Sequence, residues 1–237
     1  MHRDSVNICR IFKRPNSQAG QGWITSCDEN AFNASYIDSP KPYSDALVLE
    51  ITMSQLIRTS RTHPIRIDSV AAKPGWGLIG MSFCPGKKQL DGLTGSWSRD
   101  LYLDLARIQD WGASIVVSLI EPHELSFLDV EALPDVVLEL GMEWRHGPIP
   151  DRHPPHQQFM LTWPTLKGEL IDKLSSGKNI FIHCMGGLGR TGVVAAMLLI
   201  EAGYSAKQAI TAVRTSRPHT IETSAQEVFV KNYVPQG

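Results

Sequence analysis

Short apolar runs alternate with helix-like patterns along the last two thirds of the chain, and Gly, Pro or polar residues separate them. Four runs are continuous enough to be buried strands: 77–83, 114–120, 142–145 and 179–182. Helical spacing or composition marks four further segments: 100–111, 136–140, 159–174 and 192–200. Because helices alternate with continuously apolar strands, we expect an α/β fold with a parallel sheet covered by helices on both faces.

Glycine and proline set the ends of several of these helices. The helix over 100–111 should end at Gly112, and Glu121-Pro122 should open a further short helix. The long helix over 159–174 contains Pro164, which predicts a kink or an interruption there.

The first part of the chain has a different character. Residues 13–45 are rich in Asn, Ser, Gly, Gln and Pro without a clear period, and 45–51 can form a strand. We therefore predict an N-terminal extension over residues 1–65, partly irregular and of unknown role, followed by the main domain over residues 66–237.

Charge and hydropathy narrow the classes of partner. Lys and Arg total 23 against 24 Asp and Glu, so no global field favours nucleic acid or a membrane surface. No apolar run reaches the ~18 residues that span a bilayer, and the first residues, Met-His-Arg-Asp-Ser, lack the apolar core of an export signal. We expect neither a nucleic-acid nor a membrane partner.

The most informative segment is His183-Cys184-Met185-Gly186-Gly187-Leu188-Gly189-Arg190-Thr191, which joins an expected strand to an expected helix. Its glycines let the backbone curl so that N–H groups point inward, and the helix N-terminus adds positive potential. These features predict a phosphate-binding loop made of His183, Met185, Gly186, Gly187, Leu188, Gly189 and Arg190 around Cys184.

Each polar residue of this loop suits phosphoryl transfer. The amides should lower the pKa of Cys184 from about 8.5 into the range of roughly 3.5 to 7.5, which makes it a nucleophile. Arg190 offers a planar charged fork for two phosphate oxygens. The Thr191 hydroxyl can hydrogen-bond the sulfur when it leaves, and His183 should orient the loop from behind. For a lone Cys184, an inert core cysteine would be the default interpretation.

Around these residues the chain is similar to the cysteine-dependent protein tyrosine and dual-specificity phosphatases, whose signature is His-Cys, five residues, Arg, and Ser or Thr. The five residues between Cys184 and Arg190 look most like those of the kinase-associated phosphatase subgroup. The segments 76–88, 147–151 and 221–226 come in that family's order. The resemblance covers about two thirds of the chain. It implies a central twisted, mainly parallel sheet flanked by helices, a phosphocysteine intermediate, no metal or other cofactor, and a kinase as a protein partner.

Asp151 is the candidate proton donor, because expelling an alkoxide or phenoxide from phosphorus is slow without one. It lies between Pro150 and Pro154 in a stiff non-helical loop. In the resembling family such an Asp protonates the leaving group and then activates water. The alternative is that Asp151 starts a turn or caps the helix near His156.

Gln226 has two interpretations. The resemblance implies that it positions the hydrolytic water, but Thr223 with Gln226 also has the spacing of a helix capping box.

Other candidates carry less weight. His146, His153 and His156 lack a supporting acidic or Cys set for a metal. Arg214 and Arg217 could form a second anion patch or complement a helix end. Cys84 could protect Cys184 in a disulfide, as in some relatives, or be a small core residue. A reactive thiolate needs a reducing compartment, so we expect the cytoplasm.

The five residues between Cys184 and Arg190 are uncharged, so they add no positive field for a polyanion. This favours a phosphoprotein or phosphopeptide over a polyanionic substrate. We therefore expect a protein phosphatase that acts on phosphotyrosine and on phosphoserine or phosphothreonine. The alternatives are a phosphopeptide-binding or kinase-scaffolding module without turnover, and sulfur or arsenate chemistry on a similar cysteine loop.

Overall fold

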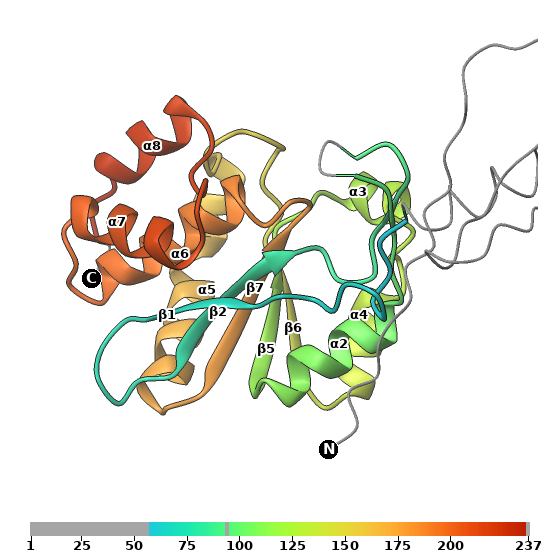
Figure 1. Cartoon of the computed structure of the whole chain (residues 1–237). Coiled ribbons are helices and arrows are strands. Elements are labelled where there is room, and N and C mark those ends of the chain that lie inside the picture. The colour runs from blue at the N-terminus through green and yellow to red at the C-terminus, as the bar shows by residue number, and fades with distance from the viewer. Residues whose placement is uncertain (1–56, 93–94, 236–237) are drawn as a thin grey trace, which may run out of the picture. The chain divides into compact units, whose positions relative to one another are not determined.

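The computed structural model describes residues 57–92 and 95–235 (Figure 1). These residues belong to a unit that begins at Met53. The predicted strand over 45–51 and nearly all of the predicted extension lie outside them, so the boundary at residue 65 stays a prediction. Within the described part, no helix is long and apolar enough to cross a membrane.

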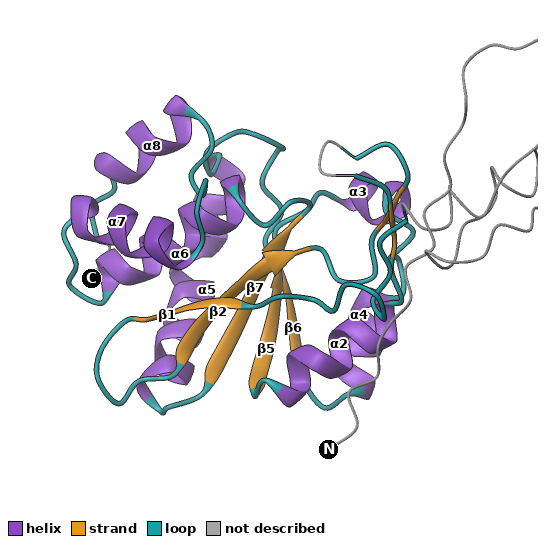
Figure 2. Ribbon diagram, in the orientation of Figure 1, coloured by secondary structure: helices purple, strands orange, loops and turns teal. Residues whose placement is uncertain are grey.

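A five-stranded sheet forms the centre of the described fold, with strand order β1-β2-β7-β5-β6 (Figure 2). Its strands are β1 Asp68–Ala71, β2 Leu78–Phe83, β5 Ala113–Ser118, β6 Glu143–His146 and β7 Asn179–Cys184. β2, β7, β5 and β6 are parallel neighbours, whereas β1 pairs antiparallel with β2. A separate two-stranded ribbon consists of β3 Lys88–Gln89 and β4 Trp97–Ser98.

Helices cover both faces of this sheet. They are α2 Leu101–Asp110, α3 Pro122–Phe127, α4 Leu133–Glu139, α5 Gln157–Ser175, α6 Gly189–Glu201, α7 Ala206–Ser216 and α8 Ser224–Lys231. α2 and α4 pack on β5 and β6, while α5 and α6 pack on β7 from the other side, and α7 and α8 pack on α6 (Figure 1). The predicted α/β class with a mainly parallel sheet is confirmed.

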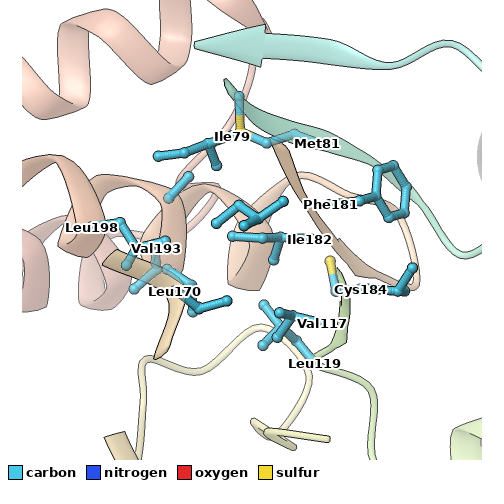
Figure 3. Packing of buried hydrophobic residues seen from close by; sticks show 14 of the residues in the cluster. Ile79, Met81, Val117, Leu119, Leu170, Phe181, Ile182, Cys184, Val193 and Leu198 are labelled. Atoms are coloured by element: carbon cyan, nitrogen blue, oxygen red, sulfur yellow. The ribbon is translucent and has the colours of Figure 1, made fainter. Parts of the chain in front are cut away.

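The core lies where α5 and α6 meet the central strands. Ile182 lies toward Val193 and Leu170, and Phe181 points to the opposite face of the sheet (Figure 3). These side chains are fully buried, as continuous apolar runs in a doubly covered parallel sheet require.

α5 is continuous across Pro164, so the interruption that we considered is not present. The neighbouring Trp163 and Leu166 are buried, whereas Pro164 lies on the exposed face of the helix. Water can therefore bind the carbonyl that the missing proline N–H leaves free, and packing of the apolar face outweighs the proline penalty.

Candidate active site

The nucleophile loop follows the carboxyl end of β7 directly. Cys184 is the last residue of β7, and α6 begins at Gly189. The amide of Cys84 donates to the carbonyl of Met185 at 3.2 Å, which ties the loop to the end of β2. The predicted order of strand, loop and helix is therefore present, at the edge where parallel sheets bind ligands.

One glycine of the loop has a conformation that other residues rarely adopt. Gly187 has φ of 69°, and a Cβ added there would lie 2.1 Å from the Ser82 carbonyl oxygen of β2. Gly186 has open space at the same position and no positive φ. The curl that we attributed to all three glycines thus depends chiefly on Gly187.

Arg217, in the connection between α7 and α8, turns the loop amides inward. Its Nε donates to the Gly187 carbonyl at 2.6 Å, and its Nη2 donates to the Gly186 carbonyl at 3.2 Å. In a trans peptide the carbonyl and the following N–H point in opposite directions. The Gly187 N–H accordingly points at Cys184 Sγ, 3.2 Å away.

A carboxylate from β1 holds Arg217 in turn. Asp68 Oδ2 accepts from Arg217 Nη1 at 2.7 Å, and Asp68 Oδ1 accepts from Arg66 at 2.6 Å. Only 8% of the Asp68 side chain and 12% of the Arg217 side chain are exposed, so solvent screens this pair weakly. The outer side of the loop is therefore fixed by charged hydrogen bonds.

Arg190 is buried and held as a fork. Its Nη1 lies 2.5 Å from Glu124 Oε2, its Nη2 lies 2.9 Å from Glu124 Oε1, and Nη1 also donates to the Ile149 carbonyl at 3.0 Å. Burial opposes the charge, but the hydrogen bonds to Glu124 and the nearby Cys184 outweigh it and hold the pKa of Arg190 above its ordinary value. The guanidinium is thus permanently charged and oriented before an anion arrives.

The structure brings Asp151 to the same loop. Its Oδ1 lies 2.8 Å from Arg190 Nη2, while 54% of its side chain is exposed. The next residue, Arg152, has φ of 60°, and the His153 amide donates to the Pro150 carbonyl at 3.1 Å. This tight turn presents the carboxyl group toward both Arg190 and solvent.

His183 lies behind the loop in a chain of hydrogen bonds. Trp144 Nε1 donates to Ser118 Oγ at 2.9 Å, and Ser118 Oγ lies 2.7 Å from His183 Nε2. The carbonyl oxygen of Cys184 lies 3.4 Å from His183 Nδ1 and can only accept, which assigns the imidazole proton to Nδ1 and leaves Nε2 to accept from the Ser118 hydroxyl. Burial lowers the pKa of His183 to about 3, so the ring is neutral.

Thr191 and Gln226 differ from the simplest expectation. The Thr191 hydroxyl is fully buried and has no hydrogen-bond partner, so the predicted bond to sulfur is not formed in this state. Gln226 is buried, and its amide bonds the backbone of two segments: Oε1 accepts from the Thr223 amide at 3.2 Å and Nε2 donates to the His153 carbonyl at 3.2 Å. The capping box is present, and the role of Gln226 in placing water stays a prediction.

Cys84 and Lys87 are buried next to the loop. Cys84 is a free thiol, and burial raises its pKa. The Lys87 ammonium lies 5.1 Å from the ring centre of Phe83 and 5.0 Å from that of Trp97. Burial lowers the pKa of Lys87 to about 8, against the opposing influence of Cys84 and Cys184.

Sequence reasoning missed Glu124 and placed Arg217 only as a possible anion patch. The sequence could have indicated Glu124, because this residue follows a buried strand. The carboxyl ends of parallel strands meet at one edge of the sheet, so Glu124 must lie beside the loop. Arg217 had none, because its acceptors are backbone carbonyls 30 and 31 residues away. His146, considered as a metal ligand, instead bonds the Ile120 carbonyl at 2.8 Å.

Known proteins resemble this chain in sequence over part of its length. Mouse cyclin-dependent kinase inhibitor 3 is 31% identical over 141 residues, which is 59% of this chain and 63% of the relative. A probable protein tyrosine phosphatase type IVA A from Dictyostelium discoideum is 34% identical over 94 residues, 40% of this chain and 55% of that protein. The chain thus spans less than two thirds of the length of these relatives.

Solved structures agree with the sequence comparison. A kinase associated phosphatase with its catalytic-site cysteine changed to serine has a TM-score of 0.63 and 27% identity, covering 71% of this chain and 93% of that one. The active form of Tk-PTP has a TM-score of 0.53 and 26% identity, covering 70% and 98%. The family model described as "Swiss Army Knife protein, DSP-PTPase phosphatase domain" matches residues 104–230, more than half of the chain. This protein therefore belongs to the Swiss Army Knife DSP-PTPase family, and its fold is that of a protein tyrosine and dual-specificity phosphatase domain.

Proposed function

We propose that this protein hydrolyses phosphotyrosine, and also phosphoserine or phosphothreonine, in proteins through a phosphocysteine intermediate. The observation that carries the proposal is the convergence of three groups on one loop. Cys184 lies at its base with the Gly187 amide 3.2 Å from the sulfur, and Arg190 at its end is 2.8 Å from Asp151. A thiol nucleophile, a guanidinium clamp and a carboxylic acid are the parts that two-step phosphoryl transfer needs.

In the first displacement, Cys184 Sγ attacks phosphorus while the bond to the leaving oxygen breaks. Arg190 and the inward-facing amides hold the equatorial oxygens, over which the charge spreads. Asp151 donates its proton to the leaving oxygen, so that an alcohol or a phenol departs. The buried Glu124 keeps the fork of Arg190 in the plane that this contact needs.

In the second displacement, water attacks the phosphorus of phosphocysteine. A proton of the water passes to Asp151, and the electron pair of the P–S bond returns to Cys184. Thr191, whose buried hydroxyl has no other partner, would donate a hydrogen bond to the sulfur as it becomes a thiolate.

The choice of a protein substrate rests on charge. The loop spacers from Met185 to Gly189 are all uncharged, so they add no field for a polyanionic lipid or nucleic acid. The names of the mouse relative and of the solved kinase associated phosphatase support a kinase as the proposed protein partner. Binding of purified phosphorylated kinases to the Cys184→Ser protein, competed by vanadate, would test this partner.

The activity is tested with p-nitrophenyl phosphate and with matched phosphotyrosine, phosphoserine and phosphothreonine peptides. Cys184→Ser should abolish turnover and retain peptide binding. Asp151→Asn should lower kcat by roughly 100- to 10,000-fold, and least with good leaving groups. Wild-type protein that binds phosphopeptides without turnover between pH 5 and 8 would favour the binding module, and turnover restricted to phosphotyrosine would remove the dual specificity.

A further inference from the structure

A lysine beside the nucleophile loop is buried without a partner for its charge. Lys87 is 4% exposed, and within residues 57–92 and 95–235 no hydrogen bond or ion pair engages its ammonium group. The ammonium lies against two aromatic rings, 5.1 Å from the centre of Phe83 and 5.0 Å from that of Trp97. A charge that is buried without a counter-charge destabilises a fold, so this chain retains Lys87 at a cost.

Three largely buried arginines around the loop differ from Lys87 in this respect. Each pairs with a carboxylate at 2.5–2.7 Å: Arg99 with Asp104, Arg190 with Glu124, and Arg217 with Asp68. In the described part of the chain, no carboxylate pairs with Lys87. Its counter-charge must therefore come from another kind of group.

The backbone that carries Lys87 is held at the end of β2. The Gly86 amide donates to Asp104 Oδ2 at 2.9 Å, and the Arg99 amide donates to the Lys87 carbonyl at 3.2 Å. Gly86 has φ of 72°, and a Cβ added there would lie 2.6 Å from Leu101 Cβ, so the turn packs directly on the start of α2. The position of Lys87 relative to the sheet is thus set by the fold.

The ammonium lies close to the nucleophile. Phe83 is the register partner of Cys184 in the parallel pair of β2 and β7, so the two side chains project to the same side of the sheet. The ring of Phe83 thus lies beside Cys184, and the Lys87 ammonium lies against that ring. In agreement, negative charge on Cys84 or Cys184 acts to raise the pKa of Lys87, which burial lowers to about 8.

The two sulfurs are not equivalent as sources of negative charge. Cys84 Sγ donates to the Pro85 carbonyl at 3.6 Å, which requires the thiol proton, and burial raises the pKa of Cys84. Cys184 Sγ instead accepts from the Gly187 amide at 3.2 Å. Cys84 therefore stays a neutral thiol, and the anion that faces Lys87 is the thiolate of Cys184.

We propose that the Lys87 ammonium is the buried counter-charge that holds Cys184 as a thiolate. The two charges attract more strongly than in water, because the protein around them is less polar. Arg190 also acts on the sulfur, but Glu124 and Asp151 bind its guanidinium and compensate its charge. Lys87 has no such compensation. The inference deepens the proposed function, since the thiolate is the nucleophile of the first displacement, and it rests on that function for its effect on turnover.

The test is the rate of alkylation of Cys184 by iodoacetamide from about pH 4 to about pH 9, because only the thiolate displaces iodide. Mass spectrometry of the tryptic peptide 179–190 measures this cysteine alone. Lys87→Met keeps an apolar stem against the two rings, so it should fold, and it should raise the midpoint of the pH profile by about one unit. The shift should persist in about 0.5 M NaCl, since salt screens buried charges weakly. The acidic limb of kcat/KM toward p-nitrophenyl phosphate should move by the same amount.

The matched control is Lys88→Met, which changes the neighbouring lysine, an exposed residue paired with Asp129. Its alkylation midpoint should equal that of wild type. The inference is overturned if the midpoint moves by less than about 0.3 unit in Lys87→Met, or as far in Lys88→Met as in Lys87→Met. A midpoint shift in a protein that hydrolyses no phosphate ester would overturn the proposed function and leave the role of Lys87 standing.

Discussion

Replacing Glu124 with Gln tests how strongly the fold depends on the buried ion pair beneath the loop. The Arg190 and Glu124 side chains are 1% and 3% exposed, and two hydrogen bonds of 2.5 and 2.9 Å join them. Glu124 Oε2 also accepts from the Glu121 amide at 2.7 Å. Glutamine keeps the volume of the side chain, but it removes the charge and presents N–H groups to a guanidinium that can only donate.

Breaking one side of a buried pair costs about 3–5 kcal/mol, because the remaining charge stays buried. For a domain of this size that corresponds to a fall in Tm of roughly 6–20 °C. The Arg190 fork loses its orientation as well, so kcat toward p-nitrophenyl phosphate should fall by about 100-fold. Urea unfolding and steady-state kinetics measure the two effects separately.

The matched control is Glu143→Gln, a carboxylate that is 47% exposed and paired with Lys173 and Arg145 at 2.6 and 3.1 Å. Exposed pairs contribute roughly 0–1 kcal/mol, so this variant should stay near wild type in both measurements. If Glu124→Gln lost less than about 1 kcal/mol and kept kcat within about threefold, the reasoning on buried charge would be refuted.

Gly187→Ala should abolish turnover and lower stability by more than about 4 kcal/mol, because its Cβ meets the β2 backbone, whereas Gly186→Ala should fold normally; equal Tm values would contradict the assigned curl. The folded pKa of His183, about 3 against an ordinary 6.5, means that the unfolded chain binds an extra proton between these values. The free energy of unfolding should therefore fall below pH 6.5 by up to about 1.4 kcal/mol per pH unit, and urea titrations of His183→Asn should show a slope shallower by that amount. Lys87→Met should raise the free energy of unfolding at pH 7 by up to about 3 kcal/mol, because burial lowers the pKa of Lys87 from 10.5 to about 8, and this gain should vanish as pH rises through 10.5. A gain that persisted at pH 11 would show that charge is not its cause.

The sequence pattern predicted the features whose partners lie close together in the chain. A continuous apolar run from Asn179, a glycine-rich turn and a second apolar run from Gly192 determine β7, the nucleophile loop and α6 with little help from elsewhere. The Thr223–Gln226 capping box was predictable for the same reason, since its two partners are three residues apart.

The sequence did not predict the supports of the loop, because they depend on pairs that only the topology brings together. Glu124 and Arg190 are 66 residues apart, and Asp68 and Arg217 are 149 residues apart. In the sequence, each of these four charged residues looks like an ordinary surface residue. Only the order of the strands in the sheet brings the two members of each pair together. The sequence likewise did not predict the bond from Gln226 to His153, because this partner is the backbone of a loop 73 residues earlier.

The salt bridge between Asp68 and Arg217 limits how far the chain can be shortened from its N-terminus and still be an intact enzyme. The family match begins at residue 104, yet Asp68, β1 and β2 all precede it. A fragment trimmed to that match would expose the edge of β7 and release the guanidinium that holds the carbonyls of Gly186 and Gly187. The smallest unit that keeps the proposed phosphate site intact must therefore start upstream of Asp68.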